Sequence, residues 1–120
     1  MLIAITSTGT SLDAKVDVRF GRAKFIILYN SDHSLFSVHD NNLNLNAPQG
    51  AGIQTAQNIL NLEATVLITG NCGPKAFKVL TAGDIKIFSS PSTDVSQAIS
   101  AYQNNQLNEL TDSNVEGHWT

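Results

Sequence analysis

Three short runs of β-branched and aliphatic residues are apolar at almost every position. They are LIAIT at 2–6, TVLIT at 65–69 and IKIF at 85–88. Runs of this length without polar alternation are typical of strands that are buried on both faces of a sheet. Two further apolar runs, KFIILY at 24–29 and LFSVHD at 35–40, flank the turn-forming residues NSDHS. This arrangement predicts a β-hairpin.

Three other segments carry apolar residues at helical spacing. The first covers 49–62, where apolar residues recur three and four positions apart,. The second is expected to begin at Pro74 and to end at Gly83, because proline suits a first helical turn and glycine suits a C-terminal cap,. The third is expected after Asp94, which forms a capping-box pattern with Gln97,.

The predicted order of elements is β-β-β-α-β-α-β-α. The first three strands can form an antiparallel meander, whereas each later βα unit requires parallel pairing. The pattern therefore predicts an α/β fold with a five-stranded mixed sheet in the order 3-2-1-4-5, with strand 2 antiparallel to the others, and three helices on its two faces. From Asn104 onward the chain is polar, and no regular element is predicted.

Composition and charge narrow the class of protein. The chain has 120 residues, the size of one domain, and its 42% hydrophobic and 14% charged residues are typical of a folded globular protein,. Its net charge of −3 argues against a nucleic-acid-binding face,. One cysteine forms no internal disulfide, and neither a signal peptide nor a membrane span is evident,. We therefore expect a cytoplasmic protein with no membrane or nucleic-acid partner.

A binding site is expected where the connections after strands 1 and 4 leave the sheet in opposite directions, because ligands of open α/β sheets bind at that point. The loop after strand 1 contains STGTS at 7–11 and DVRFGRA at 17–23, and the loop after strand 4 is GNCGP at 70–74. The second loop ends at a helix N-terminus, where free N–H groups favour an anion. The candidate binding residues from these two loops are Thr8, Gly9, Arg19, Arg22, Gly70, Asn71, Cys72, Gly73 and Lys75.

Each of these features also has a purely structural interpretation. The glycines of GNCGP suit any tight connection between a strand and a helix. Arg19 and Arg22 can instead pair with Asp13 or Asp17 at the surface,. Cys72 is either a metal ligand or, as free cysteines more commonly are, a small buried apolar residue.

Catalytic and metal-binding motifs are not evident in the sequence. GNCGPK lacks the P-loop pattern, and GAG at 50–52 lacks the dinucleotide-binding pattern,. His33 falls in the predicted hairpin turn, and neither His39 nor His118 has neighbours at metal-ligand spacing,. The residues therefore favour binding over catalysis.

The segments DVRFGRAKFIILYN, GAGIQTAQNIL, VLITGNCGPKAFKVL and GDIKIF together resemble the dinitrogenase iron–molybdenum cofactor biosynthesis family, whose members are NifX-like domains. The likeness covers residues 1–107, which gives a NifX-like domain followed by a polar tail at 108–120. The ending DSNVEGHW is most similar to the orange-protein branch of sulfate-reducing bacteria. The positions of the family motif are Arg19, Phe20, Gly21, Arg22, Gly70, Gly73 and Pro74, and the resemblance thereby adds Phe20 and Gly21 to the candidate binding residues.

The resemblance implies a ribonuclease-H-like fold and a non-enzymatic carrier for an anionic metal–sulfur cluster, with protein donors or acceptors of that cluster. The cargo it implies is a molybdenum–copper sulfide cluster held without covalent ligation, or alternatively an iron–molybdenum cofactor precursor. A Cys-ligated iron–sulfur cluster fits poorly, because it needs four thiolates. The alternative functions are a regulatory interaction module and, with less support, a phosphate or nucleotide hydrolase, which would need carboxylates to hold metal ions.

Overall fold

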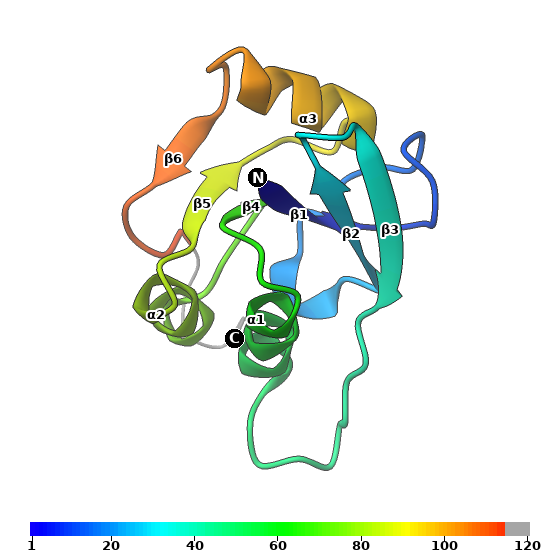
Figure 1. Cartoon of the computed structure of the whole chain (residues 1–120). Coiled ribbons are helices and arrows are strands. Elements are labelled where there is room, and N and C mark those ends of the chain that lie inside the picture. Colours follow the sequence, from blue (N-terminus) through cyan, green and yellow to red (C-terminus); the bar gives the residue numbers. More distant parts are fainter. Residues whose placement is uncertain (115–120) are drawn as a thin grey trace.

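The computed structural model describes residues 1–114, which form a single mixed β-sheet with helices on both faces (Figure 1). The strands are β1 (Leu2–Ser7), β2 (Phe25–Asn30), β3 (Leu35–Asp40), β4 (Val66–Thr69), β5 (Lys86–Ser89) and β6 (Asn108–Leu110). The helices are α1 (Ala51–Asn61), α2 (Pro74–Ala82), α3 (Val95–Gln103) and the short 3₁₀ helix η1 (Phe20–Arg22).

The strand order is β3-β2-β1-β4-β5-β6. β4 lies parallel to both of its neighbours, β1 and β5, whereas β2 is antiparallel to β1 and β3. The α/β class, the order 3-2-1-4-5 and the antiparallel strand 2 are thereby confirmed. The predicted hairpin is β2–β3, and the three predicted helices are α1, α2 and α3.

The sheet separates two apolar cores (Figure 1). Helices α1 and α2 cover one face, where Ala4 of β1 and Leu67 of β4 belong to the core. Helix α3 covers the other face, where Ile3 and Ile5 of β1 belong to the core. Neighbouring residues of a strand point to opposite faces, so a strand between two helical layers must be apolar at nearly every position. This explains the uninterrupted apolar run of β1.

The prediction that no regular element follows Asn104 is wrong at β6. This three-residue strand lies within the stretch that the sequence suggested as a polar tail at 108–120, and it pairs antiparallel with β5 as a sixth strand. Asn108 and Glu109 carry no apolar pattern because β6 lies at the edge of the sheet, and only Leu110 packs against the core. The rest of the proposed tail, 115–120, including His118, lies outside the described residues.

The capping box predicted at Asp94 is also wrong. Asp94 is the N-cap of α3, but its carboxylate makes no capping hydrogen bond and pairs with Lys15 instead. The carbonyl oxygens of Ala14 and Leu12 accept hydrogen bonds from the first two N–H groups of α3, at 2.8 and 3.0 Å. The helix end is therefore capped by the backbone of the loop after β1, which a local sequence pattern does not reveal.

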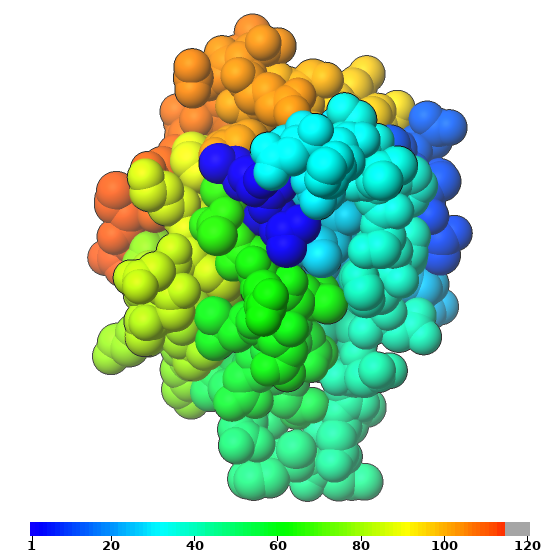
Figure 2. Space-filling model, viewed as in Figure 1, coloured from blue at the N-terminus to red at the C-terminus, as the bar shows by residue number. Residues whose placement is uncertain are grey.

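The connection between β3 and α1, residues 41–50, projects from the body of the molecule (Figure 2). Two side chains of α1 hold its backbone. Gln54 donates to the carbonyl oxygens of Asn44 and Gln49, both at 2.9 Å, and Asn58 donates to that of Asn42 at 3.2 Å. This projecting segment is thus anchored to α1 along its length.

None of the helices formed by the described residues has the length and apolar character needed to cross a membrane.

Candidate functional site

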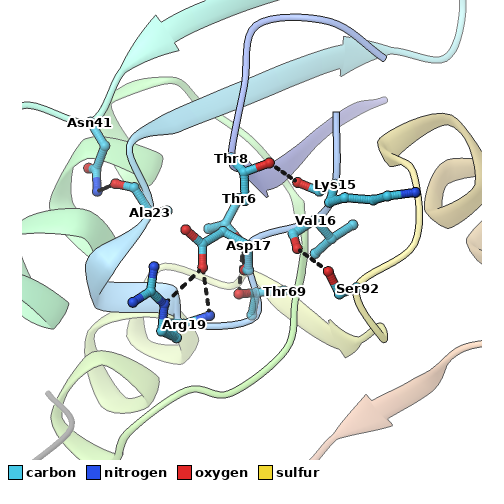
Figure 3. A network of polar contacts seen from close by, with 10 residues as sticks. All are labelled: Thr6, Thr8, Lys15, Val16, Asp17, Arg19, Ala23, Asn41, Thr69 and Ser92. Carbon is cyan, nitrogen blue, oxygen red and sulfur yellow. Dashed lines mark hydrogen bonds and ion pairs between the residues drawn. The ribbon is translucent and has the colours of Figure 1, made fainter. Parts of the chain in front are cut away.

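The connections after β1 and β4 leave the sheet in opposite directions, and two buried threonines lie at the ends of these two strands. Thr6 is near the end of β1, and Thr69 ends β4. The Thr6 hydroxyl donates to the carbonyl oxygen of Asp17 at 2.7 Å and lies 2.8 Å from the Thr69 hydroxyl (Figure 3). The N–H of Asp17 donates back to the Thr6 carbonyl at 2.8 Å. The end of the sheet thus fixes the position of the loop that follows β1.

Two loops meet at this point, which we call the cationic loop (17–24) and the glycine loop (70–75). The N–H of Asn71 donates to the carbonyl oxygen of Val18 at 2.7 Å, and the N–H of Phe20 donates to that of Asn71 at 3.2 Å. A Cβ atom on Gly70 would lie 2.6 Å from the Cα of Val18. Only glycine permits this approach. The expectation that the two loops come together is therefore confirmed.

A cleft with a volume of about 440 Å³ opens beside the cationic loop. It lies between that loop and the start of the 41–50 connection. Its lining residues are Thr8, Asp17, Arg19, Arg22, Ala23, Lys24, Asn41 and Leu43.

The side-chain amide of Asn41 holds the two walls of the cleft together. Its nitrogen donates to the carbonyl oxygen of Ala23 at 2.8 Å (Figure 3). The same nitrogen donates to the Thr55 hydroxyl at 2.9 Å, and the amide oxygen accepts from Asn58. A buried amide with all its partners satisfied is rigid. The cleft therefore has a fixed frame.

Three cationic side chains, Arg19, Arg22 and Lys24, surround the cleft, and all three are exposed. Arg19 forms an ion pair with the buried carboxylate of Asp17, with 3.5 Å between Nε and Oδ1. Neither Arg22 nor Lys24 forms an ion pair with any residue between 1 and 114. The surface ion pair that the sequence allowed is therefore present for Arg19, and Arg22 has none among the described residues. The three cations and one carboxylate that line the cleft give it a net positive charge.

The glycine loop has a different character, because its first N–H groups are already engaged. The N–H of Asn71 donates to Val18, as described above, and the N–H of Cys72 donates to Oδ1 of Asn114 at 2.7 Å. The Asn114 amide also donates to the carbonyl oxygen of Gly70 at 3.1 Å. The N–H of Asn71 is therefore engaged by the cationic loop, and the N–H of Cys72 is not available to an anion while Asn114 is in place.

Cys72 is completely buried in the core beneath α1 and α2. Burial raises the pKa of its thiol to about 12. Metals and electrophiles react with the thiolate form, and this thiol is protonated at neutral pH. Among residues 1–114, no three His, Cys, Asp or Glu side chains lie close enough together to hold a metal ion.

The structure divides the candidate residues into three groups. Thr8, Arg19 and Arg22 line the cleft. Phe20 and Gly21 are buried and do not line the cleft: Phe20 belongs to the core, and Gly21 lies against the start of α1. Gly9, Gly70, Asn71, Cys72, Gly73 and Lys75 are not among the described residues that line the cleft.

Sequence reasoning missed several residues of the cleft. Lys24 belongs to the same basic cluster as Arg19 and Arg22, and this clustering was a usable signal. Asn41 and Leu43 gave no signal, because only the pairing of β3 with β2 brings the 41–50 connection to the cationic loop.

Comparison with known proteins agrees with this architecture. A family model described as dinitrogenase iron-molybdenum cofactor matches residues 1–105. The chain is similar to the apo form of the orange protein from Desulfovibrio gigas, with 35% identity, a TM-score of 0.89, and coverage of 95% of this chain and 96% of that one. No curated protein matches the chain.

Two further solved structures are similar. A protein from Thermotoga described as a DUF35 family member shows 29% identity, a TM-score of 0.82, and coverage of 95% and 97%. A protein from Methanocaldococcus jannaschii shows 17% identity, a TM-score of 0.70, and coverage of 93% and 96%, and this likeness concerns the fold alone.

Proposed function

The chain belongs to the dinitrogenase iron-molybdenum cofactor family, and from this membership we propose that it is a non-enzymatic carrier for an anionic metal–sulfur cluster. The cluster binds in the cleft beside the cationic loop through charge and hydrogen bonds. The cargo that we favour is a molybdenum–copper sulfide cluster, and an iron–molybdenum cofactor precursor has the same anionic, sulfide-edged chemistry. A carrier also needs a protein donor and a protein acceptor for its cargo.

The observation that carries this proposal is the set of three cations around the cleft. Two of them, Arg22 and Lys24, form no ion pair with any described residue. A guanidinium group is planar, permanently charged and weakly hydrated, so it suits a compact polyanion with soft sulfide edges. The side chain of Leu43 adds an apolar wall against which such edges can pack.

The donor atoms of the cleft support binding without covalent ligation. Asp17 is the only carboxylate among its described lining residues, and these include no cysteine and no histidine. The thiol of Cys72 is buried and protonated elsewhere in the fold. We therefore propose that Cys72 is a packing residue and that it does not coordinate the cluster. The same lining lacks the paired carboxylates that metal-dependent hydrolysis requires, which favours a carrier over a hydrolase.

Titration of the apo-protein with a thiomolybdate–copper mixture at two ionic strengths tests this function. Arg22→Gln is expected to weaken binding by about 1–3 kcal/mol, the scale of a charge-assisted hydrogen bond. The salt dependence of binding should also decrease, because fewer screened charges remain in the contact. The fold should change little, since the Arg22 side chain is exposed.

Lys75→Gln is the matched control, because Lys75 is an exposed cation of the glycine loop and does not line the cleft. Its removal should leave affinity unchanged. If Lys75→Gln weakens binding as much as Arg22→Gln does, or if folded Arg19→Gln and Arg22→Gln variants bind normally, the cluster does not bind in this cleft.

A further inference from the structure

A carboxylate lies inside the cationic cleft, where an anion is expected to bind. Asp17 is only 5% exposed, yet it lines the cleft together with Arg19, Arg22 and Lys24. Burying a carboxylate is costly unless its oxygens have partners, and it also repels a bound anion. A carrier that only needed positive charge would gain nothing from this residue. The position of Asp17 therefore needs a specific explanation.

The carboxylate is held in place by its own loop and by the sheet. Its backbone is fixed by two hydrogen bonds with Thr6, and its Oδ1 accepts from the backbone N–H of Arg19 at 3.0 Å and from Nε of Arg19 at 3.5 Å. Figure 3 shows both bonds to Arg19 converging on the same carboxylate oxygen. One oxygen of Asp17 thus orients Arg19.

The other oxygen, Oδ2, accepts no hydrogen bond from any side chain or N–H group in residues 1–114, and in Figure 3 it carries no dashed line. It is not sealed in the interior, because every enclosed side-chain nitrogen and oxygen of the described residues has a partner. Oδ2 is therefore open to the cleft that Asp17 lines. An ionised carboxylate oxygen only accepts hydrogen bonds, so a ligand must bring a donor to it.

A purely positioning role for Asp17 explains Oδ1 but leaves Oδ2 without a function. An anion with no proton would place its own lone pairs against Oδ2 and would displace the water that hydrates it. An anion with one O–H or S–H group would instead donate to Oδ2 while its charged edge contacts Arg22 and Lys24. A site built to accept such a hydrogen bond discriminates strongly against analogues that lack the donor.

We propose that the cleft selects anions that carry a hydrogen-bond donor, and that Oδ2 of Asp17 accepts the hydrogen bond from this donor. The inference rests on the proposed function, since it concerns the same cleft, and it specifies the class of cargo more narrowly. A metal–sulfur cluster that fits would present a hydrosulfide, a hydroxide or a bound water at the edge that faces Asp17. Its remaining, unprotonated edge would face the cations.

Small dianions of matched size and charge provide the test in the wild-type protein. Hydrogen phosphate carries one O–H group, whereas sulfate and monofluorophosphate are dianions without one. Their affinities are measured by calorimetry at about pH 8, where inorganic phosphate is present mainly as the hydrogen phosphate dianion. Hydrogen phosphate is expected to bind at least about tenfold more tightly than either of the other two. Equal affinities for the three dianions would overturn the proposal, and so would a failure of all three to bind.

Two variants test whether Asp17 causes the preference for hydrogen phosphate. Asp17→Asn presents an N–H donor in place of an acceptor, so sulfate should gain affinity and the preference should fall to within about twofold. Arg22→Gln is the control, because it removes charge from the same cleft and keeps the acceptor. It should weaken all three dianions and preserve their order. A preference that persists in folded Asp17→Asn would refute the role of Oδ2, and if that variant does not fold, the wild-type comparison of hydrogen phosphate with monofluorophosphate decides.

The result of the dianion test can be distinguished from the result of the thiomolybdate–copper titration that tests the proposed function. Equal binding of the three dianions together with tight, Arg22-dependent binding of thiomolybdate and copper would remove the role of Asp17 and keep the carrier. Discrimination between dianions without any binding of thiomolybdate and copper would keep the selectivity and remove the metal–sulfur cargo.

Discussion

The cationic loop, which leads into β2, and the glycine loop, which follows β4, touch each other, but they use their polar groups in opposite ways. In the cationic loop, Arg22 and Lys24 line a cleft, and neither forms an ion pair with any residue between 1 and 114. In the glycine loop, the N–H groups of Asn71 and Cys72 are engaged within the chain, and the Cys72 thiol is buried. A residue type that suits a ligand is therefore not evidence of a site until its existing partners are known.

The largest effect on stability is expected at the contact between the two loops. Gly70→Ala would place a Cβ atom 2.6 Å from the Cα and 2.7 Å from the carbonyl oxygen of Val18. Backbone atoms cannot move away by a change of rotamer, so we expect a loss of about 2–3 kcal/mol in the free energy of unfolding. Chemical denaturation measures this loss. Gly50→Ala, at an exposed N-cap, is the control and should cost at most about 1 kcal/mol,. Equal costs would mean that the loops are not packed as described.

A smaller effect is expected from the buried thiol of the glycine loop. Cys72→Ser should cost about 1 kcal/mol at neutral pH, because a hydroxyl replaces an apolar thiol, and cluster binding should be retained. Loss of cluster binding with unchanged stability would identify Cys72 as a ligand.

The same substitution has a characteristic pH dependence. The ordinary pKa of the thiol is 9.0, and burial raises it to about 12 in the folded state. Below pH 9 the thiol is protonated in both states and its contribution to stability is complete. Between these two pKa values only the unfolded state loses the proton, so wild-type stability falls by up to about 1.4 kcal/mol per pH unit relative to Cys72→Ser. Denaturation of both proteins at pH 7 and at about pH 10 tests this, since the stability advantage of the wild type should disappear or reverse at the higher pH. A constant difference would mean that the thiol is not buried.

An effect on stability of similar size is expected at Asn114, whose side chain forms hydrogen bonds with the glycine loop. Asn114→Ala removes the acceptor of the Cys72 N–H and should cost about 1 kcal/mol of stability. Thr111→Ala, at an exposed position nearby, should cost less and is the control. Cluster affinity should not change in either variant. An increase in affinity for Asn114→Ala would show that the freed N–H of Cys72 binds the cargo. The glycine loop, and not only the cationic loop, would then be part of the binding site.

The sequence was sufficient for most of the fold, because long-range pairing followed from local patterns. The uninterrupted apolar runs of β1 and β4 indicated central strands, and Pro74 and Gly83 marked the ends of α2. The strand β6 was not predictable, since an edge strand of three residues needs only backbone partners. At α3 the cap came from the carbonyl groups of a distant loop and not from the Asp94 side chain.

The sequence predicted that the two loops meet, but it did not predict which residues line the candidate cleft. Chain order placed the loops after β1 and β4 together, and clustering of Arg19 and Arg22 indicated positive charge. No local pattern showed that the Asn114 side chain forms hydrogen bonds with the glycine loop, or that Asn41 and Leu43 line the cleft. These contacts join segments that are far apart in the chain, so they depend on the folded arrangement and not on neighbouring residues.

The most direct test of the central claim is to map where the cargo binds. The ¹⁵N-labelled apo-protein is titrated with a thiomolybdate–copper mixture, and the shift of each backbone amide signal is followed. We expect the largest shifts in the cationic loop and at Asn41 and Leu43, with little change in the glycine loop. Largest shifts at residues 70–75, with the amides of 17–24 unaffected, would contradict the account.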